Sequence, residues 1–251
     1  MHPPRLSGLL RRALPFATIA LAAPISLIGP GIASANAESG LVRVAYSIPD
    51  GPSVDIYLAG RRVARDLGRG EVAPYVSLPR GTASYAFRRA GSRRTSAPIL
   101  SGSTTVLAGK AVTLVGSGFL RKDNVKGRTY VKREPTTKPI GVTRVRVFPL
   151  SPDAPTFDVY LGTTKGSPFD VGRGYPMTNG YRRAPAGKRT FVLTRHGSKR
   201  ALLKRTGTLV ATEPATLYVF GAFGPRTGEE RLTLRLVSDA LPGAAARRFA
   251  G

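Results

Sequence analysis

Apolar and polar residues alternate in short stretches along most of the chain after residue 40. A period of two is typical of half-buried β-strands, because successive side chains point to opposite faces of a sheet. Turn sequences such as Pro-Asp-Gly-Pro separate the stretches, and no segment shows an apolar stripe with helical spacing. The expected strands of the first half are LVRVAYS (41–47), VDIYLA (54–59), YVSLP (75–79), ASYAFRRA (83–90), PILSGSTTVL (98–107) and AVTLVGSG (111–118). Roughly six or seven short strands in such a length predict an antiparallel β-sandwich.

The pattern occurs twice. Val-Arg-Val at 42–44 returns at 145–147, and Pro-Asp-Gly-Pro at 49–52 returns as Pro-Asp-Ala-Pro at 152–155, both at an offset of 103 residues. Further matches follow in the same order, which predicts a tandem duplication. The predicted fold class is therefore all-β, with two tandem antiparallel β-sandwich domains. The expected organisation is a first sandwich over 38–133, a linker over 134–141, a second sandwich over 142–240 and a tail over 241–251.

The first 37 residues have the features of a secretory signal peptide. Three arginines precede the apolar stretch ALPFATIALAAPISLIGPGIA, and small residues follow it. We favour cleavage after Ala37, with Ala35 as the alternative. A retained membrane anchor is the other interpretation, and the prolines of the apolar stretch disfavour a straight spanning helix. The expected location is therefore secreted or associated with the cell envelope, with Sec and Tat export both open.

The rest of the chain offers no second hydrophobic stretch that is long enough to span a bilayer. The final residues, LPGAAARRFAG, begin like a sortase signal but lack the Thr-Gly pair and an apolar span before their arginines. We expect a tail here and no anchor.

The chain contains no cysteine. This excludes disulfides, thiolate catalysis, cysteine-ligated zinc, iron–sulfur clusters and the lipidated cysteine of a lipoprotein. The stability of an exported protein of this kind must come from its core.

The net charge indicates a function more strongly than any motif does. There are 39 Lys and Arg residues against 14 Asp and Glu, a net charge of +25, or +22 after removal of the signal and its three arginines. So positive a chain attracts polyanions. For an exported protein these are cell-wall phosphate polymers, acidic polysaccharides or anionic membrane headgroups. The candidate contacts are Arg88, Arg89, Arg93, Arg94, Arg182, Arg183, Lys199, Arg200, Lys204 and Arg205.

Two other interpretations of the charge remain. One is a generally basic surface without a specific ligand. The other is extracellular nucleic-acid binding, against which weigh the export signal, the absence of tryptophan and the absence of any nucleic-acid-binding motif.

Each repeat carries a pair of aspartates five residues apart, Asp50 with Asp55 and Asp153 with Asp158. Asp50 lies in a proline-rich turn, where a carboxylate accepts backbone N–H groups, and Asp55 opens a strand. We interpret all four as structural turn and strand residues. Calcium binding and a carboxylate-dependent hydrolase acting on a glycan stay open as alternatives.

Other catalytic or cofactor motifs are weak. His196 is the only histidine after the signal and lies in a basic turn, so we expect a solvated loop residue. There is no Gly-x-Ser-x-Gly sequence, and the Gly-Arg-Gly segments at 68–70 and 172–174 lack the features of a phosphate-binding loop. We therefore predict no catalytic, cofactor-binding or metal-binding residues, and no cofactor.

The stretches VRVAYSIPDGPSVDIYLAG, YVSLPRGTASYAFRRAG and TTVLAGKAVTLVGSG, with VRVFPLSPDAPTFDVYLG in the second copy, resemble the bacterial domain-of-unknown-function 4397 family. The resemblance covers nearly all of the chain after the signal. It implies exported, often repeated, Ig-like or transthyretin-like sandwiches and assigns no catalytic residue. Where the family often has a histidine before Ser-Pro-Asp, this chain has Ala45-Tyr46 and Phe148-Pro149. Together these observations predict an exported, non-enzymatic cell-envelope binding or structural module, of open oligomeric state.

Overall fold

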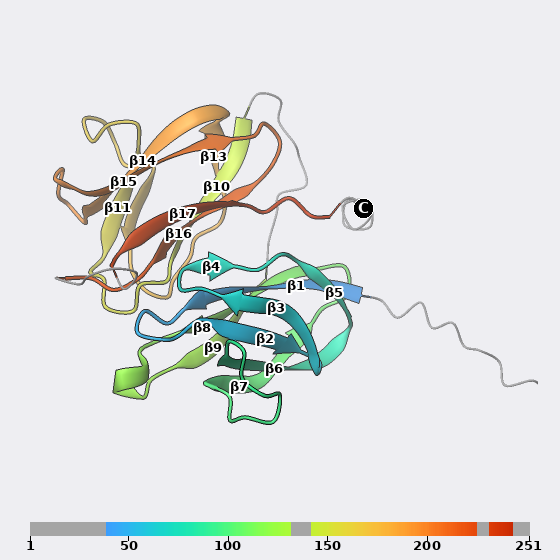
Figure 1. Ribbon diagram of the computed structural model, residues 1–251. Helices are drawn as coiled ribbons and strands as arrows, with labels where there is room; N and C mark the ends of the chain where they lie inside the picture. The colour runs from blue at the N-terminus through green and yellow to red at the C-terminus, as the bar shows by residue number, and fades with distance from the viewer. Residues whose placement is uncertain (1–38, 132–141, 225–230, 243–251) are drawn as a thin grey trace, which may run out of the picture. The chain divides into compact units, whose positions relative to one another are not determined.

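The computed structural model describes residues 39–131, 142–224 and 231–242 (Figure 1). The all-β class with two tandem sandwiches is confirmed: four sheets hold the described strands, and the one helical segment among these residues is the short 3-10 turn η1 (Leu120–Lys122). The predicted signal peptide, the linker and residues 243–251 of the tail lie outside the described residues. No helix within the described part of the chain has the length and hydrophobicity to cross a membrane.

The first sandwich pairs an inner sheet with an outer sheet. The inner sheet has the order β4 (Glu71–Val72), β1 (Ser39–Ser47), β8 (Ala111–Ser117), β9 (Lys126–Val131), and β5 (Val76–Pro79) also pairs with β1. The outer sheet has the order β3 (Arg61–Leu67), β2 (Val54–Leu58), β6 (Gly81–Arg89), β7 (Leu100–Val106).

The second sandwich repeats this plan. Its inner sheet has the order β13 (Arg182–Pro185), β10 (Val142–Pro149), β16 (Ala215–Phe220), β17 (Thr233–Ser238). Its outer sheet has the order β12 (Asp170–Arg173), β11 (Phe157–Leu161), β14 (Gly187–Arg195), β15 (Ala201–Leu209).

Two details refine the sequence prediction. Each inner sheet contains one parallel pair, β1 with β8 and β10 with β16, within otherwise antiparallel sheets. Strand β3 is an addition to the expected strands, because its sequence RRVARDL is too polar for an alternating pattern. It lies at the edge of the outer sheet, where Leu67 belongs to the core and Val63 and Ala64 pack against it.

Each sandwich has its own core between its two sheets, and a third apolar cluster joins the sandwiches. Alternate residues of β1, such as Val42 and Val44, face the first core. Their neighbours face the other way, where Ala45 packs in one cluster with Phe148 and Tyr218 of the second repeat. The inner sheets are thus buried on both faces, which explains why nearly every residue of β1, β8, β10 and β16 is buried.

Candidate functional site

The repeated aspartates Asp50 and Asp153 lie in the turns after β1 and β10, and their N–H donors come from a distant part of the chain. Asp50 accepts the backbone N–H groups of Leu120 and Arg121 at 2.9 and 3.0 Å, 70 and 71 residues further along the chain. Asp153 accepts that of Phe223 at 2.7 Å, again 70 residues along. Both carboxylates therefore fasten the loop that follows an inner-sheet strand to the turn after β1 or β10.

The second aspartate of each pair is buried within its strand. Asp55 in β2 accepts the N–H of Asp66 at 2.9 Å and lies 3.3 Å from the Arg62 guanidinium. Its side chain is enclosed, whereas that of Arg62 is partly exposed. One backbone donor and one exposed cation hold this carboxylate.

Asp158, the equivalent residue in β11, has more partners. It accepts the N–H groups of Gly172 and Gly197 at 2.7 and 3.0 Å, and the Nδ1 atom of His196 lies 2.9 Å from its Oδ1. Burial alone would raise the pKa of Asp158, but the hydrogen bonds from His196, Gly172 and Gly197 outweigh it and hold the pKa below its ordinary value. His196 is half exposed in its loop, and the aspartate anchors its ring.

The two aspartates of each pair thus accept hydrogen bonds from backbone N–H groups in different parts of their sandwich. Among the described residues, no group of three or more His, Cys, Asp or Glu side chains is placed to hold a metal ion.

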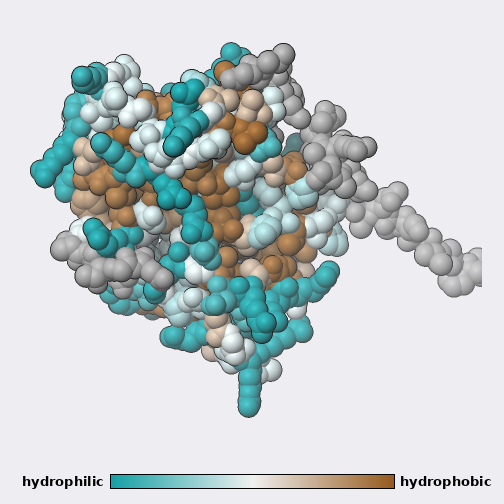
Figure 2. Space-filling view, turned by 45° about the horizontal axis from the view of Figure 1, so that its top comes forward, coloured by the Kyte–Doolittle hydropathy of each residue, from teal (hydrophilic) through white to brown (hydrophobic). Residues whose placement is uncertain are grey.

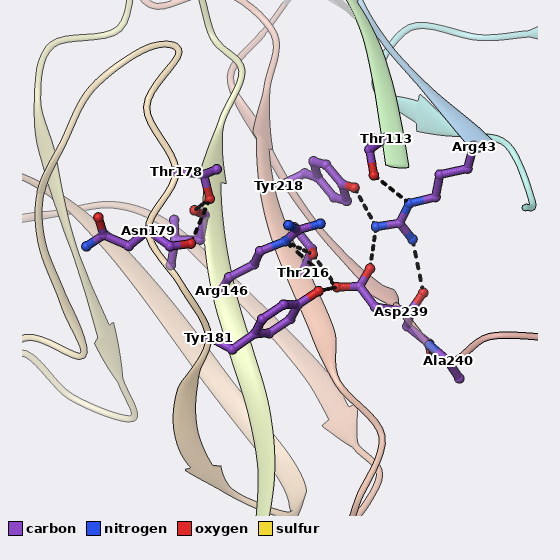
Figure 3. A network of polar contacts seen from close by, with 12 residues as sticks. Arg43, Thr113, Arg146, Thr178, Asn179, Tyr181, Thr216, Tyr218, Asp239 and Ala240 are labelled. Carbon is purple, nitrogen blue, oxygen red and sulfur yellow. Dashed lines mark hydrogen bonds and ion pairs between the residues drawn. The ribbon is translucent and has the colours of Figure 1, made fainter. Parts of the chain in front are cut away.

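A polar network, which the sequence reasoning missed, lies between the two inner sheets (Figure 3). The guanidinium of Arg43 in β1 donates to Thr113 at 3.1 Å and to the Tyr218 hydroxyl at 2.8 Å, and it forms an ion pair with Asp239. Arg146 in β10 donates to Thr216 at 2.8 Å, with Asp239 3.9 Å away. All three charged side chains are almost fully enclosed.

The duplication explains the two halves of this network. Arg43 with Thr113 corresponds to Arg146 with Thr216 at the same offset of 103, and each guanidinium lies over a tyrosine ring, Tyr75 at 4.7 Å and Tyr181 at 5.0 Å. The signal in the sequence was an arginine in the middle of an otherwise apolar strand, present in both copies of Val-Arg-Val.

Asp239 is the one acid among the described residues that pairs with both arginines. Thr216 and Tyr181 each donate a hydrogen bond of 2.5 Å to its Oδ2 atom. Burial alone would raise the pKa of Asp239, but the charges of Arg43 and Arg146 and these two hydrogen bonds hold it below its ordinary value. The network therefore joins the repeats through an ionised, buried carboxylate.

Most acids of the described residues form hydrogen bonds or ion pairs within the protein. Of the 14 acidic residues, Glu38, Glu134, Glu229 and Glu230 lie outside the described ranges, which leaves ten. Of these ten, only Asp66 and Asp123 are exposed. Figure 2 shows hydrophilic side chains projecting in groups, with apolar surface between them, and the charged groups among them are accordingly mostly basic.

Exposed basic side chains occur on the hairpins of the outer sheets, as well as on β3, the segment 121–128 and β13. The hairpin β6–β7 (81–106) contains four arginines and the hairpin β14–β15 (187–209) seven Lys and Arg residues, and neither contains an acid. The two hairpins occupy equivalent positions in the two repeats. No acid of the hairpins themselves offsets their charge.

The turn of each hairpin has nearly the same sequence and backbone. Arg-Ala-Gly-Ser-Arg-Arg (89–94) matches Arg-His-Gly-Ser-Lys-Arg (195–200) at an offset of 106. Gly91 and Gly197 have φ angles of +72° and +76°, in the left-handed region that glycine favours. In both turns the serine N–H donates to the carbonyl of the first arginine, at 3.0 and 2.9 Å. We call 89–94 the first basic turn and 195–200 the second basic turn.

The candidate contacts do not form one patch. Arg89, Arg93 and Arg94 belong to the first basic turn, with Arg88 beside it and its guanidinium 6.0 Å from the Tyr57 ring. Lys199 and Arg200 belong to the second basic turn, and Lys199 donates to the Gly166 carbonyl at 2.9 Å.

The remaining candidates follow on neighbouring strands. Lys204 and Arg205 lie on β15, and Arg205 borders a cavity of about 170 Å³ between β15 and β17. Arg182 and Arg183 lie apart, on the inner-sheet strand β13, and Arg182 is paired with Asp170 at 3.3 Å.

The comparisons with known proteins give a family. Two matches, over residues 40–160 and 143–249, are to the family described as "Domain of unknown function (DUF4397)". A search of curated proteins found no match.

Solved structures show only remote similarity. The Bacillus anthracis TIE protein is 12% identical with a TM-score of 0.23, over 74% of this chain and 33% of that one, so the chain spans about a third of its length. A structure titled "Alpha-glucan binding by a streptococcal virulence factor" is 11% identical with a TM-score of 0.24, over 71% and 92% of the two chains. A streptococcal ancillary pilin is 14% identical with a TM-score of 0.18, over 76% and 64%.

Proposed function

The chain belongs to the DUF4397 family, and from that premise we propose that it is an exported, non-enzymatic module that binds anionic, phosphate-bearing polymers of the cell envelope through its exposed arginines and lysines. The predicted signal peptide supports export. The positions of the charged side chains support the binding role.

One observation carries this proposal. The carboxylates of the described residues mostly point inward, onto backbone N–H groups and buried arginines, whereas equivalent hairpins of the two repeats expose basic side chains and contain no acid. A basic surface with few interspersed acids creates a positive potential that concentrates polyanions. Arginine also binds phosphate with two parallel hydrogen bonds, so it suits a phosphate-bearing polymer.

The test is retention of the chain from Glu38 onward, which holds all of the described structure, on purified bacterial cell walls. We expect strong retention at low ionic strength that falls steadily with the logarithm of the salt concentration, because binding releases counterions from the polymer. Walls stripped of their phosphate polymers by hydrofluoric acid should retain little of the protein.

Three outcomes would overturn the proposal. These are no retention even at low ionic strength, equal retention on the stripped walls, and stronger retention on vesicles of anionic phospholipid or on DNA than on intact walls. The last outcome would favour a membrane or nucleic-acid ligand.

A further inference from the structure

The four sheets follow one another in the order outer, inner, inner, outer. The first core lies between the outer and inner sheets of the first repeat, and the second core between those of the second. The third cluster, with Ala45 and Val115 on one side and Phe148 and Tyr218 on the other, lies between the two inner sheets. Each outer sheet is therefore left with one face that no other sheet covers.

This order directs these two outer faces away from each other, and on the second of them Tyr160 is itself buried. In the first outer sheet, Tyr57 and Arg88 project on the face opposite to the core residues Ile56 and Phe87. In the second, Tyr160 and Lys204 project on the face opposite to Val159 and Leu203. The first and second basic turns end the central hairpins of these two sheets.

We propose that the protein is bivalent: each basic turn, with the outer sheet beside it, binds its own anionic polymer strand, so that one molecule links two polymers. This inference rests on the proposed function and adds to it a cross-linking role. The duplication supports it, because five of the seven positions at 88–94 and 194–200 keep a basic residue, glycine or serine in both copies.

The contacts between the two inner sheets, which we call the joint, hold the two outer sheets on opposite sides of it. Arg43, Tyr218 and Asp239 connect the inner sheets in an enclosed network, and the Ser47 hydroxyl donates to the Leu150 carbonyl at 2.7 Å across the same boundary. A joint with a buried apolar cluster and a buried ion pair resists the rotation that would bring both turns to one side. The geometry therefore favours two separate polymers over double attachment to one flat surface.

The test uses beads coated with long-chain polyphosphate, in two populations with different dyes. The wild-type protein should join the two populations into mixed aggregates. The variants Arg93→Ser/Arg94→Ser and Arg200→Ser/Lys204→Ser each weaken one of the two binding sites. All four replaced side chains are exposed. Each should still be retained on beads, with a salt slope lower by about 1.4 for two lost phosphate contacts, and should lose mixed aggregation.

Controls and outcomes separate this inference from the proposed function. The variant Lys110→Ser/Lys126→Ser, which removes two exposed charges outside the basic turns, should aggregate beads like the wild type. Retention of the wild type without mixed aggregation would overturn bivalency and leave the proposed function intact, whereas no retention would remove both. Mixed aggregation that survives in both binding-site variants would also overturn it, and sedimentation under the same conditions would then reveal a dimer.

Discussion

Arginines at equivalent positions of the two repeats form two kinds of pair, one buried and one exposed. At the joint between the inner sheets, Arg43 and Arg146 are enclosed and share one carboxylate, that of Asp239. On the outer hairpins, Arg94 and Arg200 are exposed, and their hairpins contain no acid. The first pair is structural because burial requires compensation of its charge, and the second leaves its charge available to a ligand.

The joint itself is only partly symmetric. Arg43 donates to Thr113, Tyr218 and the Ser238 carbonyl besides its ion pair with Asp239. For Arg146, Thr216 accepts from Nε, and its Nη2 nitrogen is buried without a hydrogen-bond partner. Duplication supplied two buried arginines but one acid, so the stability of the joint depends on that acid more than on either arginine.

Replacing Asp239 should disrupt the contact between the two inner sheets and have the largest effect on the free energy of unfolding. Asp239→Asn leaves two enclosed guanidinium groups without a counter-charge, which we expect to lower the free energy of unfolding by about 3–5 kcal/mol. Urea unfolding of wild type and variant measures the change. Glu71→Gln is the matched control, because its ion pair with Arg235 also spans the repeats but is half exposed, and should cost less than about 1 kcal/mol.

The pH dependence sharpens this prediction. Because the pKa of Asp239 is lowered in the folded protein, its contribution is complete above the ordinary carboxyl pKa of about 3.9 and is lost as the pH falls through the folded value. The stability gap between wild type and Asp239→Asn should therefore be constant near neutral pH and close below about pH 4. A gap that stays constant into strong acid would show that the charge of Asp239 does not carry the effect.

The two strand aspartates provide a smaller comparison between the repeats. Asp158 accepts hydrogen bonds from two backbone N–H groups and contacts His196, whereas Asp55 accepts one N–H and pairs with a partly exposed arginine. Asp158→Asn should thus lower the free energy of unfolding by about 2 kcal/mol and Asp55→Asn by about 1 kcal/mol. Thermal or urea unfolding tests the order, and equal losses would mean that the extra partners of Asp158 contribute nothing.

Local patterns predicted the sandwiches, their duplication and most strands, because alternation and turn residues act over a few positions. Such local patterns do not predict contacts between residues that are far apart in the sequence. Asp50 lies in a turn, yet its donors lie 70 and 71 residues further along the chain. Arg43 and Arg146 were visible only as members of a repeated Val-Arg-Val, and Asp239 had no repeated motif to single it out. The similarity of the two basic turns was available in the sequence and became meaningful once both were seen to end equivalent hairpins.

Replacing the exposed arginines of the first basic turn should have the smallest effect on stability, in contrast to replacing Asp239 between the inner sheets. Arg93 and Arg94 are exposed at a turn whose backbone is held by Gly91 and by the Ser92 N–H bond to the Arg89 carbonyl, none of which needs a guanidinium. The variant Arg93→Ser/Arg94→Ser should therefore stay within about 0.5 kcal/mol of the wild type in urea unfolding. Its retention on cell walls should nevertheless fall, with a reduced salt dependence. A clear loss of stability would mean that these arginines, like Arg43, are part of the fold, and their charge would no longer point to a ligand.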